Sequence, residues 1–118
     1  MINLAGGTAG NTLTVKGNYS SNGGRLQMNS VLGDDTSATD QLIVQGGTQG
    51  DTRVSVNNLH GLGAQTDRGI RVVAVGGDSS GTFTLQGRAV AGAWEYQLAK
   101  DASDGSWYLR SESASLLP

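Results

Sequence analysis

The stretch Leu42–Val56, LIVQGGTQGDTRVSV, contains the pattern that decides the fold. Two short runs with apolar residues at alternate positions, Leu42–Val44 and Val54–Val56, flank a polar segment that holds three glycines. Alternation with a period of two is typical of β-strands that bury one face. Glycine is typical of the corner between such strands, because it adopts positive φ at no steric cost. The stretch therefore predicts two short strands joined by a turn.

Similar pairs of runs lie on both sides of this stretch, LTV and LQM before it and IRV and FTL after it. Corresponding residues are 28 or 29 positions apart: Leu13 to Leu42, Leu42 to Ile70, Leu26 to Val54, and Val54 to Phe83. A fixed period in this range indicates a solenoid whose units stack on one another. Because the units consist of strands, we predict an all-β fold, a parallel β-helix of about three rungs. An antiparallel β-sandwich with similarly spaced hairpins is the alternative. Inward-facing positions are predicted at Leu13, Val15, Leu26, Met28, Leu42, Val44, Val54, Val56, Ile70, Val72, Phe83 and Leu85.

The period ends after Leu85, where the aromatic residues concentrate. Four of the six aromatic residues lie within residues 94–108, in two alternating runs around an Asp-Gly turn signal. Such a pattern predicts an antiparallel β-hairpin, which can cover the open end of a stack with large side chains. Alternation predicts that the side chain of Tyr108 points opposite to those of Trp107 and Leu109. We expect it to be either partly exposed or in contact with a partner. The predicted cap and folding nucleus comprise Trp94, Tyr96, Leu98, Trp107 and Leu109, above Ile70, Val72, Phe83 and Leu85. We expect one domain, residues 1–118, with rungs over 11–88 and the cap over 89–112.

Composition and charge narrow the classes of function. The net charge is −2 with scattered charges, so nothing indicates a nucleic-acid partner. The longest apolar run is far too short to span a bilayer, and the start lacks the features of a signal peptide. With no cysteine, a disulfide framework and thiol chemistry are excluded. We expect the chain to be a fragment of a longer protein.

Few residues suggest chemistry. His60 is the only histidine and reads as a surface residue in a turn. Asp34, Asp35 and Asp40 alternate with Ser and Thr in a segment typical of turns, where short side chains bond backbone groups. A weak cation site and catalysis on a carbohydrate are the alternatives for this cluster. We predict no enzyme activity, no cofactor, no metal site and no small-molecule substrate.

Three blocks of sequence carry a resemblance to a known family. The first is Gly17–Tyr19 followed by Gly24 and Leu26. The second runs from Asp34 to Gly46. The third is Thr66–Ile70, running into Val73 and Val75 and closing on Tyr96-Gln-Leu98 and Trp107-Tyr108-Leu109. Together they resemble the C-terminal passenger segment of classical type V autotransporters of Gram-negative bacteria, of the pertactin-like or AIDA-like kind.

The resemblance implies a right-handed parallel β-helix ending in a hairpin cap, called the autochaperone region. Its implied function is to nucleate β-helix folding at the cell surface and support secretion across the outer membrane. Its implied partners are the upstream passenger and the downstream outer-membrane β-barrel translocator of the same chain. The alternative function is an adhesin or self-association module, which would use the outward residues Thr14, Lys16, Gln27, Asn29, Ser55 and Asn57.

Overall fold

A computed structural model shows a chain built from β-strands. The structure describes residues 2–4, 9–59, 61–87, 89–92 and 94–113. Within these ranges there is no helix, and accordingly none long and apolar enough to cross a bilayer. The strands are β1 (Ile2–Asn3), β2 (Thr12–Val15), β3 (Tyr19–Ser30), β4 (Gln41–Val44), β5 (Thr48–Asn58), β6 (Ile70–Val75), β7 (Thr82–Leu85), β8 (Ala89–Ala91), β9 (Trp94–Lys100) and β10 (Trp107–Ser113).

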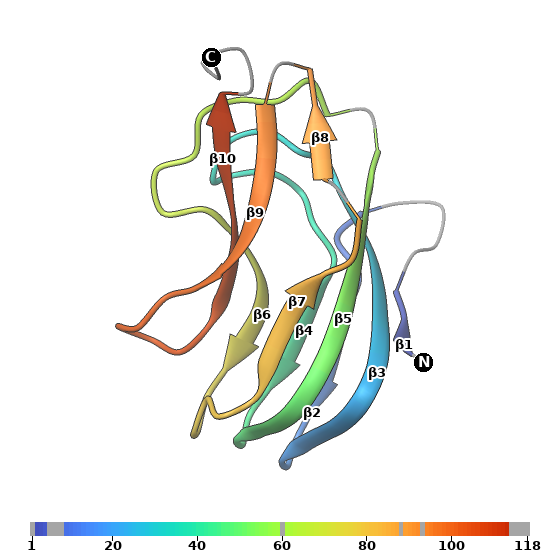
Figure 1. Ribbon diagram of the computed structural model, residues 1–118, viewed down its shortest axis with the longest axis vertical. Coiled ribbons are helices and arrows are strands. Elements are labelled where there is room, and N and C mark those ends of the chain that lie inside the picture. Colours follow the sequence, from blue (N-terminus) through green and yellow to red (C-terminus); the bar gives the residue numbers. More distant parts are fainter. Residues whose placement is uncertain (1, 5–8, 60, 88, 93, 114–118) are drawn as a thin grey trace.

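The strands form two sheets that face each other across the core (Figure 1). One sheet has the order β1-β3-β5-β7 and all of its pairs are parallel. The other has the order β2-β4-β6-β10-β9-β8, with parallel pairs up to β6 and antiparallel pairs beyond it. The all-β prediction and the antiparallel hairpin are confirmed. The winding of the chain as a three-rung right-handed β-helix stays a prediction.

Pairing between equivalent strands of the first two units follows the sequence period. Leu13 pairs with Leu42, 29 residues later, and Leu26 pairs with Val54, 28 residues later. Both spacings are those expected from the sequence. From β2 through β5, equivalent apolar residues therefore lie side by side on neighbouring parallel strands.

The other two predicted correspondences are wrong. Leu42 pairs with Val73 rather than Ile70, and Val54 pairs with Leu85 rather than Phe83. The physical reason is a longer connection: three residues more separate Val56 from Val73 than separate Met28 from Leu42. These residues extend the loop after β5 and the start of β6.

A β-bulge absorbs the change of phase in β6. Trp107 pairs with Val73 and Tyr108 with Arg71, which leaves Val72 as the extra residue. Val72 and Val73 are both fully buried, although they are consecutive. A bulge has this effect because it interrupts the alternation of side chains along one strand.

The core lies between the two sheets. Most of the predicted inward residues are fully buried, whereas Leu13, Val15, Val56 and Leu85 are half-buried at its margins. The buried apolar residues are Leu26, Met28, Leu32, Leu42, Val44, Val54, Ile70, Val72, Val73, Val75, Phe83, Ala89, Ala91, Tyr96, Trp107, Tyr108 and Leu109.

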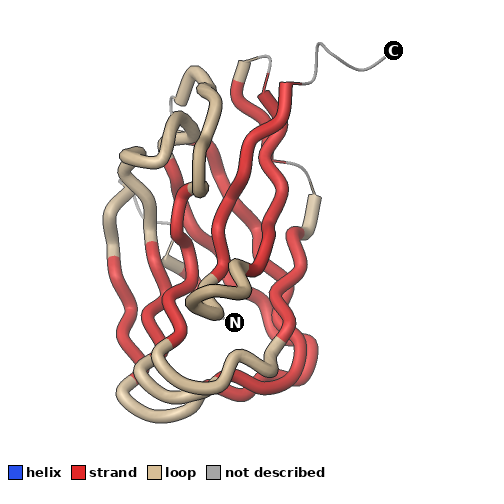
Figure 2. Tube along the Cα trace, turned by 90° about the vertical axis from the view of Figure 1, so that its left-hand side faces the viewer, coloured by secondary structure: helices blue, strands red, loops and turns tan. Residues whose placement is uncertain are grey.

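Turns of successive units stack on one another at one end of the molecule (Figure 2). The amide of Gly46 donates to the carbonyl of Gly17 at 3.0 Å, and the amide of Gly77 donates to the carbonyl of Gly46 at 2.8 Å. The Asn18 side chain accepts a bond from the Gly47 amide at 2.8 Å. The stacked strands therefore continue into stacked turns whose polar backbone groups are paired.

The two ends of the stack differ. At the C-terminal end, β10, β9 and β8 continue the sheet beyond β6. At the N-terminal end, β2 is the outermost strand of its sheet, and β1 covers β3 only at Leu26 and Gln27. Among the described residues, no strand pairs with the outer edge of β3 from Tyr19 to Arg25. In the sheet of β2, β4 and β6 the C-terminal end is thus closed by the hairpin and the N-terminal end presents a strand edge, whereas in the parallel sheet β7 remains an edge strand.

Gly50 offers a test of the close stacking of β3 on β5. A Cβ at Gly50 would clash with the carbonyl oxygen of Ser21, whereas a Cβ at Gly87 would meet nothing within 4 Å. The φ angles are nearly equal, 78° and 79°. Gly87→Ala should lower the free energy of unfolding by about 1–2 kcal/mol through φ strain alone. Gly50→Ala should cost more than ~3 kcal/mol in urea titration, because backbone must move as well. Equal losses would contradict the close approach of the two strands.

Candidate functional site

The hairpin of β9 and β10 forms the closed end of the stack. The two strands pair in register from Trp107 opposite Lys100 to Ser113 opposite Trp94. β10 also pairs antiparallel with β6, and β8 pairs antiparallel with β9. The hairpin therefore uses backbone hydrogen bonds to occupy the edge of the last parallel strand.

The structure brings the predicted cap residues and the last unit together in one core. Tyr96 and Leu109 are fully buried and Trp107 is 8% exposed, while Trp94 and Leu98 are half-buried. Beneath them Ile70, Val72 and Phe83 are buried and Leu85 is half-buried. Their role as a folding nucleus stays a prediction.

An aromatic row connects the hairpin to the first unit. Trp107 meets Phe83 edge to face, with ring centroids 5.6 Å apart, and Phe83 stacks on Tyr19 at 5.9 Å. The Tyr19 hydroxyl lies 2.9 Å from the hydroxyl of Thr52. Both ring separations lie in the range of favourable aromatic pairs. Tyr19 is not among the residues predicted to face inward, because it stands at the very start of β3 and outside the alternating run.

The Tyr96 hydroxyl joins two loops beneath the hairpin. It donates to the Gly33 carbonyl at 2.7 Å and accepts a bond from the Ala64 amide at 3.2 Å. Burial raises the pKa of Tyr96, so the hydroxyl stays protonated over the physiological range and remains a donor. Through this one atom β9 fixes the loop after β3 and the loop after β5.

The prediction that Tyr108 would be partly exposed is wrong. Its side chain is 6% exposed, not partly exposed, because two arginines cover the ring. The guanidinium carbons of Arg68 and Arg110 lie 5.2 and 5.9 Å from the ring centroid, within the range of cation–π contacts. The Tyr108 hydroxyl donates to Asp104 at 2.6 Å. The ring is thus part of the packing of the hairpin.

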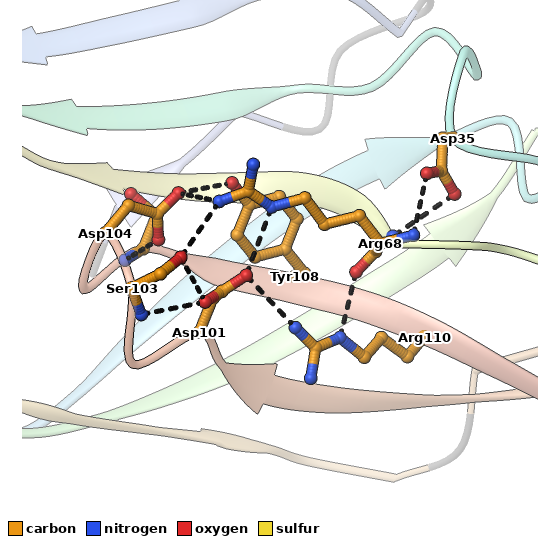
Figure 3. Close-up of polar contacts among 9 residues, drawn as sticks. Asp35, Arg68, Asp101, Ser103, Asp104, Tyr108 and Arg110 are labelled. Carbon is orange, nitrogen blue, oxygen red and sulfur yellow. Dashed lines mark hydrogen bonds and ion pairs between the residues drawn. The ribbon is translucent and has the colours of Figure 1, made fainter.

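Arg68 reaches from the loop before β6 to the turn of the hairpin (Figure 3). Its Nε lies 3.1 Å from an Asp101 carboxylate oxygen, and its Nη2 lies 2.8 Å from an Asp104 oxygen. Arg110 contacts the same Asp101 oxygen at 3.4 Å and donates to the Arg68 carbonyl at 2.8 Å. We call Arg68, Asp101, Asp104, Tyr108 and Arg110 the hairpin latch.

Asp35 holds the backbone that carries Arg68. Its carboxylate accepts hydrogen bonds from the amides of Asp67, Arg68 and Gly69 at 2.9–3.1 Å (Figure 3). Desolvation opposes ionisation, yet the three amide donors together hold the pKa of Asp35 below its usual value. The loop after β3 thus orients the loop after β5, which in turn orients the latch.

The other two aspartates of the predicted cluster, Asp34 and Asp40, form hydrogen bonds in two different places. Asp34 accepts bonds from the Thr36 amide at 3.0 Å and the Thr36 hydroxyl at 2.6 Å, as expected of a turn-forming aspartate. Asp40 is fully buried and accepts bonds from the amides of Asn11 and Asn29. His60 lies outside the described residues. Across the described ranges, no group of three or more His, Cys, Asp or Glu side chains could hold a metal ion.

Sequence reasoning missed the hairpin latch. Arg68 precedes its two partners, Asp101 and Asp104, by more than 30 positions in the sequence. No recognised motif surrounds either the arginine or the two aspartates. The one local signal is the segment DASDG, Asp101–Gly105. Its two aspartates bond backbone amides two residues on and so present carboxylates on one side of the turn.

The fold and the site define a class of protein: an all-β domain of stacked parallel strands closed at one end by an aromatic hairpin. The chain belongs to the family described as Autochaperone Domain Type 1, whose model matches residues 2–98. It is 48% identical over 120 residues to the protein YdeU of Escherichia coli K12, covering 99% of this chain and 26% of YdeU.

Other relatives are autotransporters. The adhesin BmaC autotransporter of Brucella suis is 49% identical over 112 residues, covering 85% of this chain and 3% of BmaC. The autotransporter adhesin AIDA-I of Escherichia coli is 41% identical over 108 residues, covering 88% of this chain and 8% of AIDA-I. The chain thus spans between 3% and 26% of the length of these three relatives.

Removing the Tyr96 hydroxyl tests its joining role. Tyr96→Phe leaves the Gly33 carbonyl and the Ala64 amide without this partner, so the free energy of unfolding should fall by about 1–3 kcal/mol. The matched control is Tyr19→Phe, which removes one hydroxyl contact from a half-buried ring and should cost about 1 kcal/mol or less. Urea titrations of both variants measure the difference. A smaller loss for Tyr96→Phe than for Tyr19→Phe would contradict the assignment.

The latch predicts a dependence of stability on pH. Bonds from the Ser103 hydroxyl and amide, and then from Arg68, lower the pKa of Asp101 from 3.8 to about 2. A carboxylate with a depressed pKa stabilises the fold above its unfolded pKa and loses that contribution as pH falls through its folded pKa. The urea midpoint should therefore decline between pH 3.8 and about 2, and less steeply in Asp101→Asn. Asp78→Asn, at an exposed turn residue, should keep the wild-type slope. Identical slopes for wild type and Asp101→Asn would refute this role.

Proposed function

We propose that this chain is the autochaperone region of an autotransporter passenger. It nucleates the folding of the upstream β-helix at the cell surface and supports secretion across the outer membrane. In this proposal the alternating strands are the last three rungs of a right-handed parallel β-helix, and the hairpin is its cap. Membership of the autochaperone family supports the assignment.

The observation that carries the mechanism is the difference between the two ends. Unpaired edges of β2 and β3 can accept further parallel strands, whereas the hairpin occupies the corresponding edge of β6. In the sheet of β2, β4 and β6, growth of the stack is therefore directed toward the N-terminal side, and β7 is the edge strand of the other sheet. Adding a strand to an existing edge avoids the nucleation cost of pairing two free segments.

The closed end supplies stability for such a template. The hairpin buries Tyr96, Trp107 and Leu109 and pairs along β6. Burying a large apolar side chain contributes about 1.5–3 kcal/mol. A folded C-terminal end outside the membrane also opposes backward movement of the chain, so that folding contributes to the driving force for export.

The partners and location follow from the same proposal. The partners are the upstream passenger β-helix and the downstream outer-membrane β-barrel of the same chain. The protein resides at the cell surface or is secreted from a Gram-negative bacterium, in keeping with the autotransporter names of its relatives. The module acts by folding and is not an enzyme.

A second candidate is adhesion or self-association, since three relatives bear the name adhesin. Of the residues predicted to face outward, Thr14, Lys16 and Asn57 are exposed and Gln27 and Ser55 are partly so. Asn29 is buried, which corrects its prediction. The loop after β3 covers it there, with its amide bonded to Asp40.

Surface display of the parent protein tests the folding function. Trp107→Ala and Leu109→Ala each create a cavity costing about 2–5 kcal/mol at the closed end, so displayed passenger should fall several-fold. Asp34→Ala, at an exposed turn, should change display little. Antibody labelling of intact cells, normalised to the amount of translocator in the outer membrane, measures display. Equal display in all three variants would count against the proposal.

A further inference from the structure

One face of the parallel sheet carries two arginines side by side. Arg25 of β3 pairs in register with Arg53 of β5, and both are exposed. Their neighbours Leu26 and Val54 point into the core, so the arginines point outward. Adjacent strands lie about 4.8 Å apart, which places two like charges at close range.

These charges have no counter-ion in the described part of the chain. Ion pairs there involve Arg68 and Arg110, and no hydrogen bond or ion pair joins Arg25 or Arg53 to an acidic residue. Like charges directly opposite one another on neighbouring strands destabilise a sheet. The sequence places them 28 residues apart, one unit of the repeat, so the pairing is a direct consequence of the stacking.

The surface beside the arginines is hollowed. A depression of about 580 Å³ is lined by Arg53 together with Gly23, Asp51, Thr84 and Gln86. Its size falls in the range of ligand sites, about 300–1,000 Å³. A β-bulge between Asn22 and Gly24 interrupts β3 here, and Gly23 contributes no side chain. Bulges often occur where a strand is bent to form a binding surface.

The chemistry of the lining selects the ligand. Arg53 lines the depression, and Arg25 stands beside it in register on β3. Arginine binds a planar or tetrahedral oxyanion through two hydrogen bonds. Thr84 and Gln86 can donate and accept, and the Asp51 carboxylate accepts bonds from hydroxyl groups. A carboxylate in the lining disfavours a bare anion and favours one attached to a hydroxyl-rich body. The lining also includes the half-buried Leu85, and it contains no aromatic side chain.

We propose that this outer face of β3, β5 and β7 binds an acidic saccharide. Arg25 and Arg53 hold its carboxylate or sulfate group, and Asp51, Thr84 and Gln86 contact its hydroxyl groups. The site lies on the side of the stack, away from the hairpin latch. Binding there is independent of the folding function proposed above.

Calorimetric titration of the 118-residue chain tests the site with four probes. They are a heparin-derived tetrasaccharide, a galacturonic acid tetramer, maltotetraose and inorganic sulfate. We expect at least one acidic tetrasaccharide to bind at least tenfold more tightly than both maltotetraose and sulfate, with affinity falling as salt rises. Tight binding by sulfate alone would reduce the site to an anion site and overturn the saccharide assignment. Absence of binding by both acidic probes would overturn the proposal altogether.

Three double variants distinguish a specific binding site from nonspecific electrostatic attraction. Arg25→Ala/Arg53→Ala should weaken binding of the acidic tetrasaccharide at least tenfold, whereas Lys16→Ala/Arg71→Ala, with the same net charge, should change it less than twofold. Arg25→Lys/Arg53→Lys keeps the charge but loses the planar donors, and it should weaken binding at least threefold. Equal losses in the two alanine variants would contradict the site.

Stability provides an independent check. Removing the repulsion in Arg25→Ala/Arg53→Ala should leave the urea midpoint unchanged or raise it. That result shows that the lost binding is not due to unfolding. A lowered midpoint would mean that the arginines stabilise the fold, and it would overturn their assignment to a ligand.

Discussion

The structure depends on how the last parallel strand edge is closed. A stack of parallel strands has unpaired backbone groups at both ends, and each edge can pair with another chain. Here β10 pairs antiparallel with β6 and removes one of these edges. Antiparallel pairing is available to a short hairpin, whereas another parallel strand would need a further crossover. The edges left by β2 and β3 then become the sites at which the stack can grow.

Different interactions hold and orient the cap. The side chain of Arg68 is 52% exposed, so solvent screens its ion pairs with Asp101 and Asp104 and they contribute little to stability. Burial of Tyr96 and Trp107 is the larger contribution. The latch and the bonds of Asp35 therefore serve mainly to set the position of the hairpin turn on the last unit. This division matches a template, which needs both a stable end and a defined strand register.

Sequence alone predicted the strands, the hairpin and most of the core, because alternation of apolar residues depends on local geometry. It failed where the period changed: a longer connection before Val73 placed this residue opposite Leu42, where Ile70 was expected, and a bulge at Val72 interrupted the alternation along β6. A prediction that assumes a constant spacing between equivalent residues cannot detect a longer loop or a bulge. The covering of Tyr108 and the pairing of Arg25 with Arg53 were also missed. Each of these two features involves residues that are far apart in the sequence and become neighbours only in the folded chain.

Native-state hydrogen exchange, followed strand by strand as urea is increased, tests the central claim that stability is concentrated at the closed end. The account predicts that amides of β6, β9 and β10 exchange only through global unfolding, while those of β2 and the outer edge of β3 exchange through smaller openings at lower free energy. Stability would then decline from the cap toward the growing edge. Exchange of β9 and β10 before β2, or equal protection throughout, would contradict the claim.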